Sequence, residues 1–196
     1  MNNPFHKSFI LHSSFLILFS AACGRKTPEP EPVPVPPVSD FVLKNLASEF
    51  PSEIKTADYS GKVQLILFFR TDDPACRGAI ADWNALQKDF ADRGFVLIGA
   101  IVDDRPAAPI TAEAVQLGAA FPLGLADASV VAAFGGPAAI RAIPTAFLLS
   151  RDGLPRRTYA GHEPLDRLRD DIARALDGQE LVDRNPKAVA PEDNAP

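Results

Sequence analysis

KVQLILFFRTDDPACRGAI (residues 62–80) carries the strongest local signals of secondary structure in the sequence. It begins with a continuous apolar run, which is typical of a β-strand buried on both faces. A polar turn and Pro74 follow, and then apolar residues at helical spacing begin with Cys76. The stretch therefore predicts a buried strand that leads directly into a helix, with one cysteine in the first turn of that helix.

The sequence on the far side of this helix completes a strand–helix–strand unit. The helix is expected to end near residue 93, because Gly94 follows as a stop signal. A second apolar run, FVLIGAIV (residues 95–102), predicts the next buried strand. Such a unit implies two parallel strands joined by a right-handed crossover, so we expect an α/β protein.

The remaining sequence alternates strand and helix signals. It indicates, in order, a helical stretch, a short strand, a short helix, a β-hairpin and a last helix: 111–117, 121–126, 129–134, 145–161 and 164–176. A pair of glycines ends the short helix, and the turn RDG connects the two strands of the hairpin. The predicted order is therefore β-α-β, an insert, and then β-β-α.

Composition and motifs exclude several classes of function. The net charge of −5 and the pI of about 5.2, without a Lys/Arg cluster, argue against binding to nucleic acid. We find no phosphate loop, no Ser/His/Asp signature and no Cys/His spacing typical of zinc or haem, so no metal and no cofactor are expected. We interpret His162 as a lone surface residue, Trp83 as core, and Asp103 and Asp104 as a solvated loop.

The N-terminus has the layout of an export signal. An early cation precedes an apolar run over 9–19, and small residues precede Cys23. Small residues before a cysteine resemble the lipobox of bacterial lipoproteins, in which the cysteine becomes the new N-terminus and carries a diacylglycerol. Ordinary cleavage at the same position is the alternative. We expect a signal peptide at 1–22 and an exported protein, anchored to a membrane by lipid on Cys23 and facing the periplasm or the cell exterior.

A proline-rich tether follows at 23–39. Alternating prolines disfavour helix and sheet and favour the extended polyproline II conformation. Its sixteen residues GRKTPEPEPVPVPPVS span ~50 Å at about 3.1 Å per residue, which would hold the domain clear of the lipid surface. We expect the globular domain at 40–178 and a disordered polar tail at 179–196.

Five stretches in this order resemble the membrane-tethered thioredoxin-like oxidoreductases of bacteria, the TlpA/ResA type, within the redoxin and peroxiredoxin (AhpC/TSA-related) superfamily. They are DFVLKNL, GKVQLILFFRTDDPAC, GFVLIGAIVDD, FPLGLADASVVAAFGG and AIPTAFLLSRDG. The resemblance covers roughly 40–176. It implies a thioredoxin fold, which is a central mixed sheet flanked by helices, with an α/β insertion in its middle.

In that family the helix opens with a Trp-Cys-x-x-Cys motif whose first cysteine attacks and whose second resolves. Mapped onto this chain, Asp73 stands at the attacking position and Cys76 at the resolving position. If Cys23 is lipidated, one free thiol remains, and a single thiol cannot form an intramolecular disulfide. Asp73 is explained as an N-cap followed by Pro74 at the first helical position. The alternative is an acid–base partner for Cys76.

Cys76 itself allows two interpretations. In peroxiredoxins the same helix start carries Thr-x-x-Cys, and the cysteine at the position of Cys76 attacks peroxide. The helix N-terminus favours a thiolate there, whereas Asp72 and Asp73 oppose a further negative charge. Cys76 with Asp73 is therefore a candidate catalytic pair acting on protein thiols, disulfides or peroxide. An inert buried cysteine is the alternative.

AIPTA (residues 142–146) is the other candidate site. It places Ile143 and Pro144 just before a strand, where the family has a cis-proline that faces the active cysteine and presents its backbone to an extended peptide. The resemblance thus implies a substrate groove made by Pro74, Ile143, Pro144 and Thr145. We expect a thioredoxin-like redoxin with single-cysteine activity. The alternative is a non-catalytic thioredoxin-fold module that binds peptides or proteins.

Overall fold

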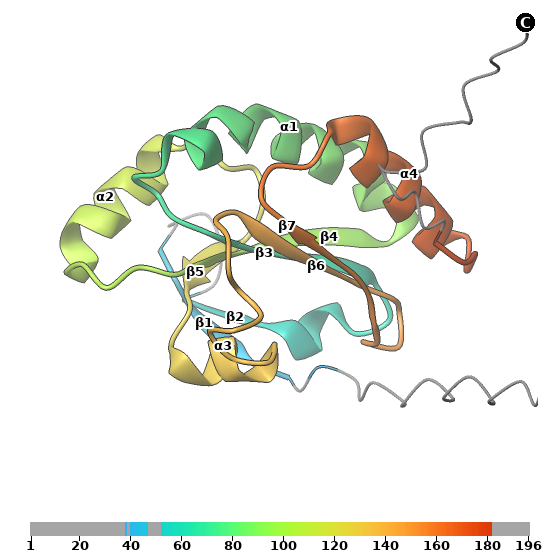
Figure 1. Ribbon diagram of the computed structural model, residues 1–196, viewed down its shortest axis with the longest axis horizontal. Coiled ribbons are helices and arrows are strands. Elements are labelled where there is room, and N and C mark those ends of the chain that lie inside the picture. Colours follow the sequence, from blue (N-terminus) through green and yellow to red (C-terminus); the bar gives the residue numbers. More distant parts are fainter. Residues whose placement is uncertain (1–37, 39, 47–51, 182–196) are drawn as a thin grey trace, which may run out of the picture. The chain divides into compact units, whose positions relative to one another are not determined.

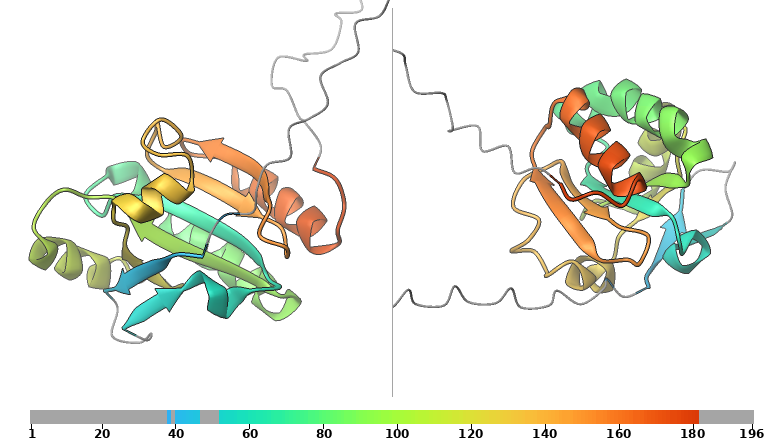
Figure 2. Two further views of the ribbon diagram at one scale, coloured as in Figure 1. Left: turned by 90° about the horizontal axis from the view of Figure 1, so that it is seen from below. Right: turned by 90° about the vertical axis from the view of Figure 1, so that its right-hand side faces the viewer.

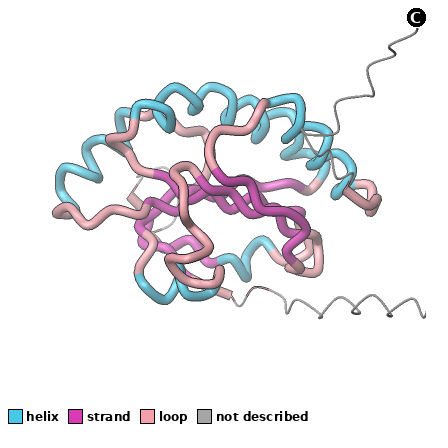
Figure 3. The backbone as a smooth tube through the Cα atoms, in the orientation of Figure 1, coloured by secondary structure: helices cyan, strands magenta, loops and turns pink. Residues whose placement is uncertain are grey.

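The computed structural model describes residues 38, 40–46 and 52–181, all within one compact unit. Within these ranges the chain forms strands, α-helices and two 3₁₀ helices (Figures 1 and 3). They are β1 (Val42–Asn45), β2 (Glu53–Lys55), η1 (Thr56–Tyr59), β3 (Val63–Phe69), α1 (Pro74–Phe90), η2 (Ala91–Arg93), β4 (Phe95–Ile101), α2 (Ala107–Gln116), β5 (Leu123–Leu125), α3 (Ala128–Ala133), β6 (Thr145–Leu149), β7 (Pro155–Ala160) and α4 (Leu165–Leu176).

The strands form one mixed sheet in the order β2-β1-β5-β4-β3-β6-β7. The central strand β3 pairs in parallel with β4 and antiparallel with β6. β5 continues the parallel part beside β4, whereas β1, β2 and β7 are antiparallel to their neighbours. Helices α1 and α4 cover one face of the sheet and α3 covers the other (Figures 1 and 2). The predicted α/β architecture is confirmed.

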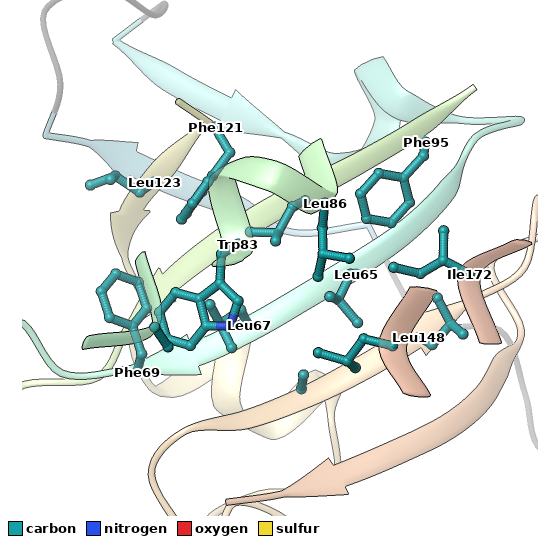
Figure 4. Packing of buried hydrophobic residues seen from close by; sticks show 14 of the residues in the cluster. Leu65, Leu67, Phe69, Trp83, Leu86, Phe95, Phe121, Leu123, Leu148 and Ile172 are labelled. Atoms are coloured by element: carbon teal, nitrogen blue, oxygen red, sulfur yellow. The ribbon is translucent and has the colours of Figure 1, made fainter. Parts of the chain in front are cut away.

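Strand β3 is buried on both faces, which explains why its sequence is a continuous apolar run. Alternate side chains, including Leu65, Leu67 and Phe69, pack beneath α1 and α4 (Figure 4). Those between them, such as Ile66 and Phe68, pack on the α3 side. Two hydrophobic layers therefore meet at this strand, and they hold its carboxyl end in one position.

Helix α1 follows the prediction closely. The α-helix ends at Phe90, and η2 extends it by one 3₁₀ turn to residue 93. Gly94 ends the helix with a φ of 86°. A side chain there would be strained by this φ, and its Cβ would lie 2.9 Å from the guanidinium of Arg151. The predicted stop at glycine is confirmed.

Two parts of the fold differ from the prediction. Helix α2 begins at Ala107 rather than at residue 111, because Pro109 lies in the first helical turn, where a missing N–H breaks no helical hydrogen bond. The two strands before residue 62, β1 and β2, were not predicted, since each has only one buried residue, Leu43 and Ile54. The short strand expected in 121–126 is β5.

Most of the expectations for the two ends of the chain fall on residues that are not described. The signal peptide at 1–22, the lipidated Cys23, all but Val38 of the 23–39 tether, and residues 182–196 of the tail lie outside the described ranges. Within those ranges, no helix is both long enough and apolar enough to cross a membrane.

Candidate functional site

The candidate site lies where β3 leads into α1, beside the loop before β6. Pairing of β3 with β6 sets Thr145 opposite Phe68, so Pro144 lies at the same edge of the sheet as the start of α1. The Ile143–Pro144 peptide bond is cis, as expected. The sequence separates these two loops by about seventy residues, and the sheet brings them together.

Asp73 caps helix α1. Its backbone is extended, and its Oδ1 accepts a hydrogen bond of 2.8 Å from the main-chain N–H of Cys76. Hydrogen bonds from that N–H and from the Cys76 thiol lower the pKa of the Asp73 carboxyl group. The N-cap interpretation is therefore confirmed, and the same carboxylate also contacts the thiol.

Cys76 is enclosed in the core, with 1% of its surface exposed. Burial is the main cause that raises the pKa of its thiol to about 12; the hydrogen bond to the Asp73 carboxylate acts in the same direction, whereas the main-chain N–H of Arg70 acts against it. Because burial and the carboxylate outweigh the amide and the helix N-terminus, the thiol is protonated at neutral pH. It donates its proton towards Asp73.

The two cations near Cys76 are bound to other groups. The guanidinium of Arg70 makes two hydrogen bonds to the carboxylate of Asp72, at 3.0 and 3.1 Å. The Nε of Arg77 donates to the main-chain carbonyl of Thr71 at 2.6 Å. Neither side chain offsets the burial of the sulfur, so the thiolate gains no ion pair in this conformation.

The four expected groove residues divide into two pairs. Pro74 is exposed and Ile143 is half-buried, whereas Pro144 and Thr145 are buried. The hydroxyl of Thr145 donates to the carbonyl of Ala142 at 2.6 Å. Among the described residues, neither the N–H nor the C=O of Ile143 has a hydrogen-bond partner. Of these four residues, Pro74 is therefore accessible to solvent and Ile143 is accessible in part.

The solvated-loop interpretation after β4 is wrong for Asp103. Its side chain is fully buried and accepts several hydrogen bonds from Arg105, the shortest of 2.6 Å, whereas Asp104 is 95% exposed. Sequence reasoning also missed Arg105 and Glu113, which join this cluster from the loop before α2 and from α2 itself. In the sequence, the only sign of this ion-pair cluster was an arginine two residues after Asp103.

The remaining candidates lie as expected. His162 is exposed, and Trp83 is part of the core beneath α1. In the part of the chain that the structure describes, no group of histidine, cysteine and acidic residues is arranged to hold a metal ion.

Comparisons with known proteins identify the family of the chain and support its fold. The model of the AhpC/TSA family matches residues 36–156. A thiol:disulfide interchange protein of the thioredoxin family from Chlorobium tepidum has a similar structure, with 25% identity, a TM-score of 0.63, and coverage of 74% of this chain and 99% of that one. No curated protein matches the sequence at a significant level.

Two exported proteins share the fold at lower identity. One is an exposed lipoprotein thioredoxin from Streptococcus pneumoniae, with 17% identity, a TM-score of 0.60, and coverage of 69% of this chain and 99% of that one. The other is a secreted thiol-disulfide isomerase from Corynebacterium glutamicum, with 20% identity, a TM-score of 0.62, and coverage of 71% and 85%. The architecture is therefore a thioredoxin fold, with α2 and β5 as its central insertion.

Proposed function

The chain belongs to the AhpC/TSA family, and from this membership we propose that it is a thioredoxin-like redoxin that binds polypeptides with thiols or disulfides outside the cytoplasm. Its working surface is the exposed start of α1 together with the main chain of Ile143. In its resting state the domain recognises a partner polypeptide but does not itself turn over disulfides. Cys76 is its single thiol, and burial together with the neighbouring Asp73 carboxylate keeps that thiol protonated.

The observation that carries this proposal is the unpaired main chain of Ile143. A half-buried residue with both a free N–H and a free C=O, next to a sheet strand, can pair with an extended peptide as a further strand would. Pro74 and Ala75 are exposed at the start of α1, at the same edge of the sheet. The surface thus combines main-chain hydrogen bonds with small side chains that a peptide can approach closely.

Single-thiol chemistry at Cys76 is the second candidate, and family membership favours it. A Cys76 thiolate could attack a partner disulfide, forming one mixed S–S bond while the other partner sulfur leaves as a thiolate. With peroxide, the same sulfur would take one oxygen to become a sulfenic acid and release water. Both reactions need the thiolate, and burial suppresses it in the resting structure. The chemistry would therefore require movement that exposes Cys76.

The recognition surface can be tested with a permanently unfolded polypeptide, such as a reduced and alkylated protein, as the probe. Backbone NMR on the full chain should show shifts at Ile143, Thr145 and the first turn of α1 when the probe is added. Ala75→Trp should abolish these shifts, because the large side chain would block the approach to the surface. Ala81→Trp is the matched control, since Ala81 is also exposed on α1 but points in another direction. Shifts confined to other parts of the chain would contradict the proposal.

We further propose that residues 1–22 direct export, that Cys23 carries the lipid, and that 23–39 tether the domain to the membrane. The layout of the N-terminus supports this, and an exposed lipoprotein and a secreted protein share the fold. In a bacterial host the protein should partition into the detergent phase, and Cys23→Ser should move it to the aqueous phase or leave it unprocessed. A mature wild-type protein that begins at Cys23 with a free amine, and stays in the aqueous phase, would exclude the anchor.

A further inference from the structure

Four side chains from three segments meet beside the start of α1, and we call them the Arg105 clamp: Thr71, Asp103, Arg105 and Glu113. The guanidinium of Arg105 donates to Asp103 at 2.6 Å, to Glu113 at 2.8 Å and to the hydroxyl of Thr71 at 3.1 Å. The Thr71 hydroxyl donates to Glu113 at 2.5 Å. The clamp thus joins the segment after β3, the segment after β4, and α2.

The clamp is partly buried: Arg105 and Glu113 are 29% and 23% exposed, whereas its other two members are enclosed. Thr71 is fully buried, and so is the side chain of Asp103. Hydrogen bonding to Arg105 lowers the pKa of both Asp103 and Glu113, so both carboxylates are charged at neutral pH. Charge-assisted hydrogen bonds of this geometry are about twice as strong as neutral ones. The clamp therefore holds Thr71 in one position relative to α2.

Thr71 belongs to the loop between β3 and α1 whose two ends contact Cys76, which we call the 70–73 loop. At one end of this loop the main-chain N–H of Arg70 is hydrogen-bonded to the sulfur, and at the other end the Asp73 carboxylate accepts the thiol proton. Outside the clamp, the loop is tied down at Thr71 by the bond from Arg77 to its carbonyl. Any shift of Thr71 would therefore move both groups that contact the sulfur.

Helix α2 has few buried apolar side chains, so these polar contacts make up much of its attachment to the domain. It buries only Ile110 and Ala114 among its ten residues, and Val115 is 62% exposed. It lies beside the first turn of α1, at the margin of the sheet (Figures 1 and 2). A segment with few buried apolar contacts opens locally at lower free energy than the core does.

We propose that the inserted helix α2 keeps the site closed: Arg105 and Glu113 are positioning residues that hold the 70–73 loop over Cys76, and release of the clamp makes the thiol accessible. This regulation rests on the proposed function, because it concerns the same site. It assigns the insertion a role as the element that governs access to the single thiol.

The test is the rate at which N-ethylmaleimide alkylates Cys76 in the full-length chain, measured on the Cys76 peptide by mass spectrometry so that Cys23 does not interfere. Glu113→Ala should speed this alkylation about tenfold or more, as expected for the loss of hydrogen bonds to a charged group that hold the loop. The faster rate should not change between zero and moderate urea, because a local opening exposes little additional surface.

Two further variants make the result decisive. Asp177→Ala breaks the exposed 3.0 Å pair with Arg93, next to the opposite end of α1, and should leave the rate unchanged. Glu113→Gln keeps the shape of the side chain and should give a smaller acceleration; it replaces Glu113→Ala if that variant does not fold. An unchanged Cys76 rate in the Glu113 variants, or an increase that only follows global unfolding in urea, would overturn the proposal. No partner is present in this experiment, so its failure would leave the recognition surface of Ile143 untouched.

Discussion

The two loops that meet at the candidate site are built in opposite ways. In the 70–73 loop nearly every polar group is satisfied: Asp73 caps α1, the Thr71 hydroxyl and carbonyl are both bonded, and the thiol beneath the loop is buried and protonated. In the loop before β6, both main-chain groups of half-buried Ile143 lack a hydrogen-bond partner within the described residues. In a thioredoxin-type site, the reactive thiol can therefore be buried while the main chain that would bind a peptide stays available.

Of the changes considered, a second thiol in the 70–73 loop should have the largest effect, and the effect should be on disulfide reductase activity. The wild-type domain should not catalyse the reduction of insulin by dithiothreitol, because one thiol cannot complete a dithiol cycle. Asp73→Cys should raise the rate at least about tenfold above wild type, since a thiol at a helix N-terminus has a lowered pKa and a larger thiolate fraction. Insulin turbidity measures the outcome.

Two controls separate chemistry from capping in that experiment. Asp73→Ser keeps an N-cap residue without adding a thiol and should stay inactive. Asp73→Cys combined with Cys76→Ala should lose the gained activity, because the resolving thiol is gone. Wild-type turnover comparable to that of a dithiol enzyme would falsify the single-thiol interpretation of the loop.

A smaller effect should appear in the stability of the protein at alkaline pH. The folded-state pKa of about 12 lies above the ordinary thiol value of 9.0, so the folded protein holds the proton more tightly than the unfolded chain does. The stabilisation that the protonated Cys76 thiol gives the folded protein is therefore complete below pH 9. It is lost as the pH rises from 9 towards 12. The loss amounts to at most about 1.4 kcal/mol per pH unit for one group.

Urea unfolding between pH 8 and 10.5 tests this dependence. Cys76→Ala should lower stability at pH 8, because it removes core volume, but it should show a shallower decline with pH than the wild type. Burial also raises the pKa of Tyr59 and Tyr159, and their contribution is common to both proteins. Parallel slopes for the two proteins would mean that the Cys76 thiol is far less shielded in solution than its burial indicates.

Local patterns were enough to predict much of this molecule, including parts of the site. The apolar runs of β3 and β4, the helical spacing of α1 and the glycine that ends it depend on neighbouring residues, and each is confirmed. The Asp73 cap is likewise a local feature that the sequence could predict, because an N-cap contacts an N–H three residues away. Strand β2 escaped prediction because three residues with one buried side chain carry almost no periodic signal.

The state of Cys76 was decided only by the tertiary structure. Its pKa depends on how completely the core encloses the sulfur and on where the Asp73 carboxylate and the Arg70 N–H point, and a sequence pattern specifies neither. The same holds for Asp103, whose burial depends on Arg105 folding back onto it, and for Glu113, which meets Thr71 across forty-two residues. Sequence determines which elements form because their signals are local, whereas burial and ion pairing are properties of the assembled packing and arise only once distant segments are in contact.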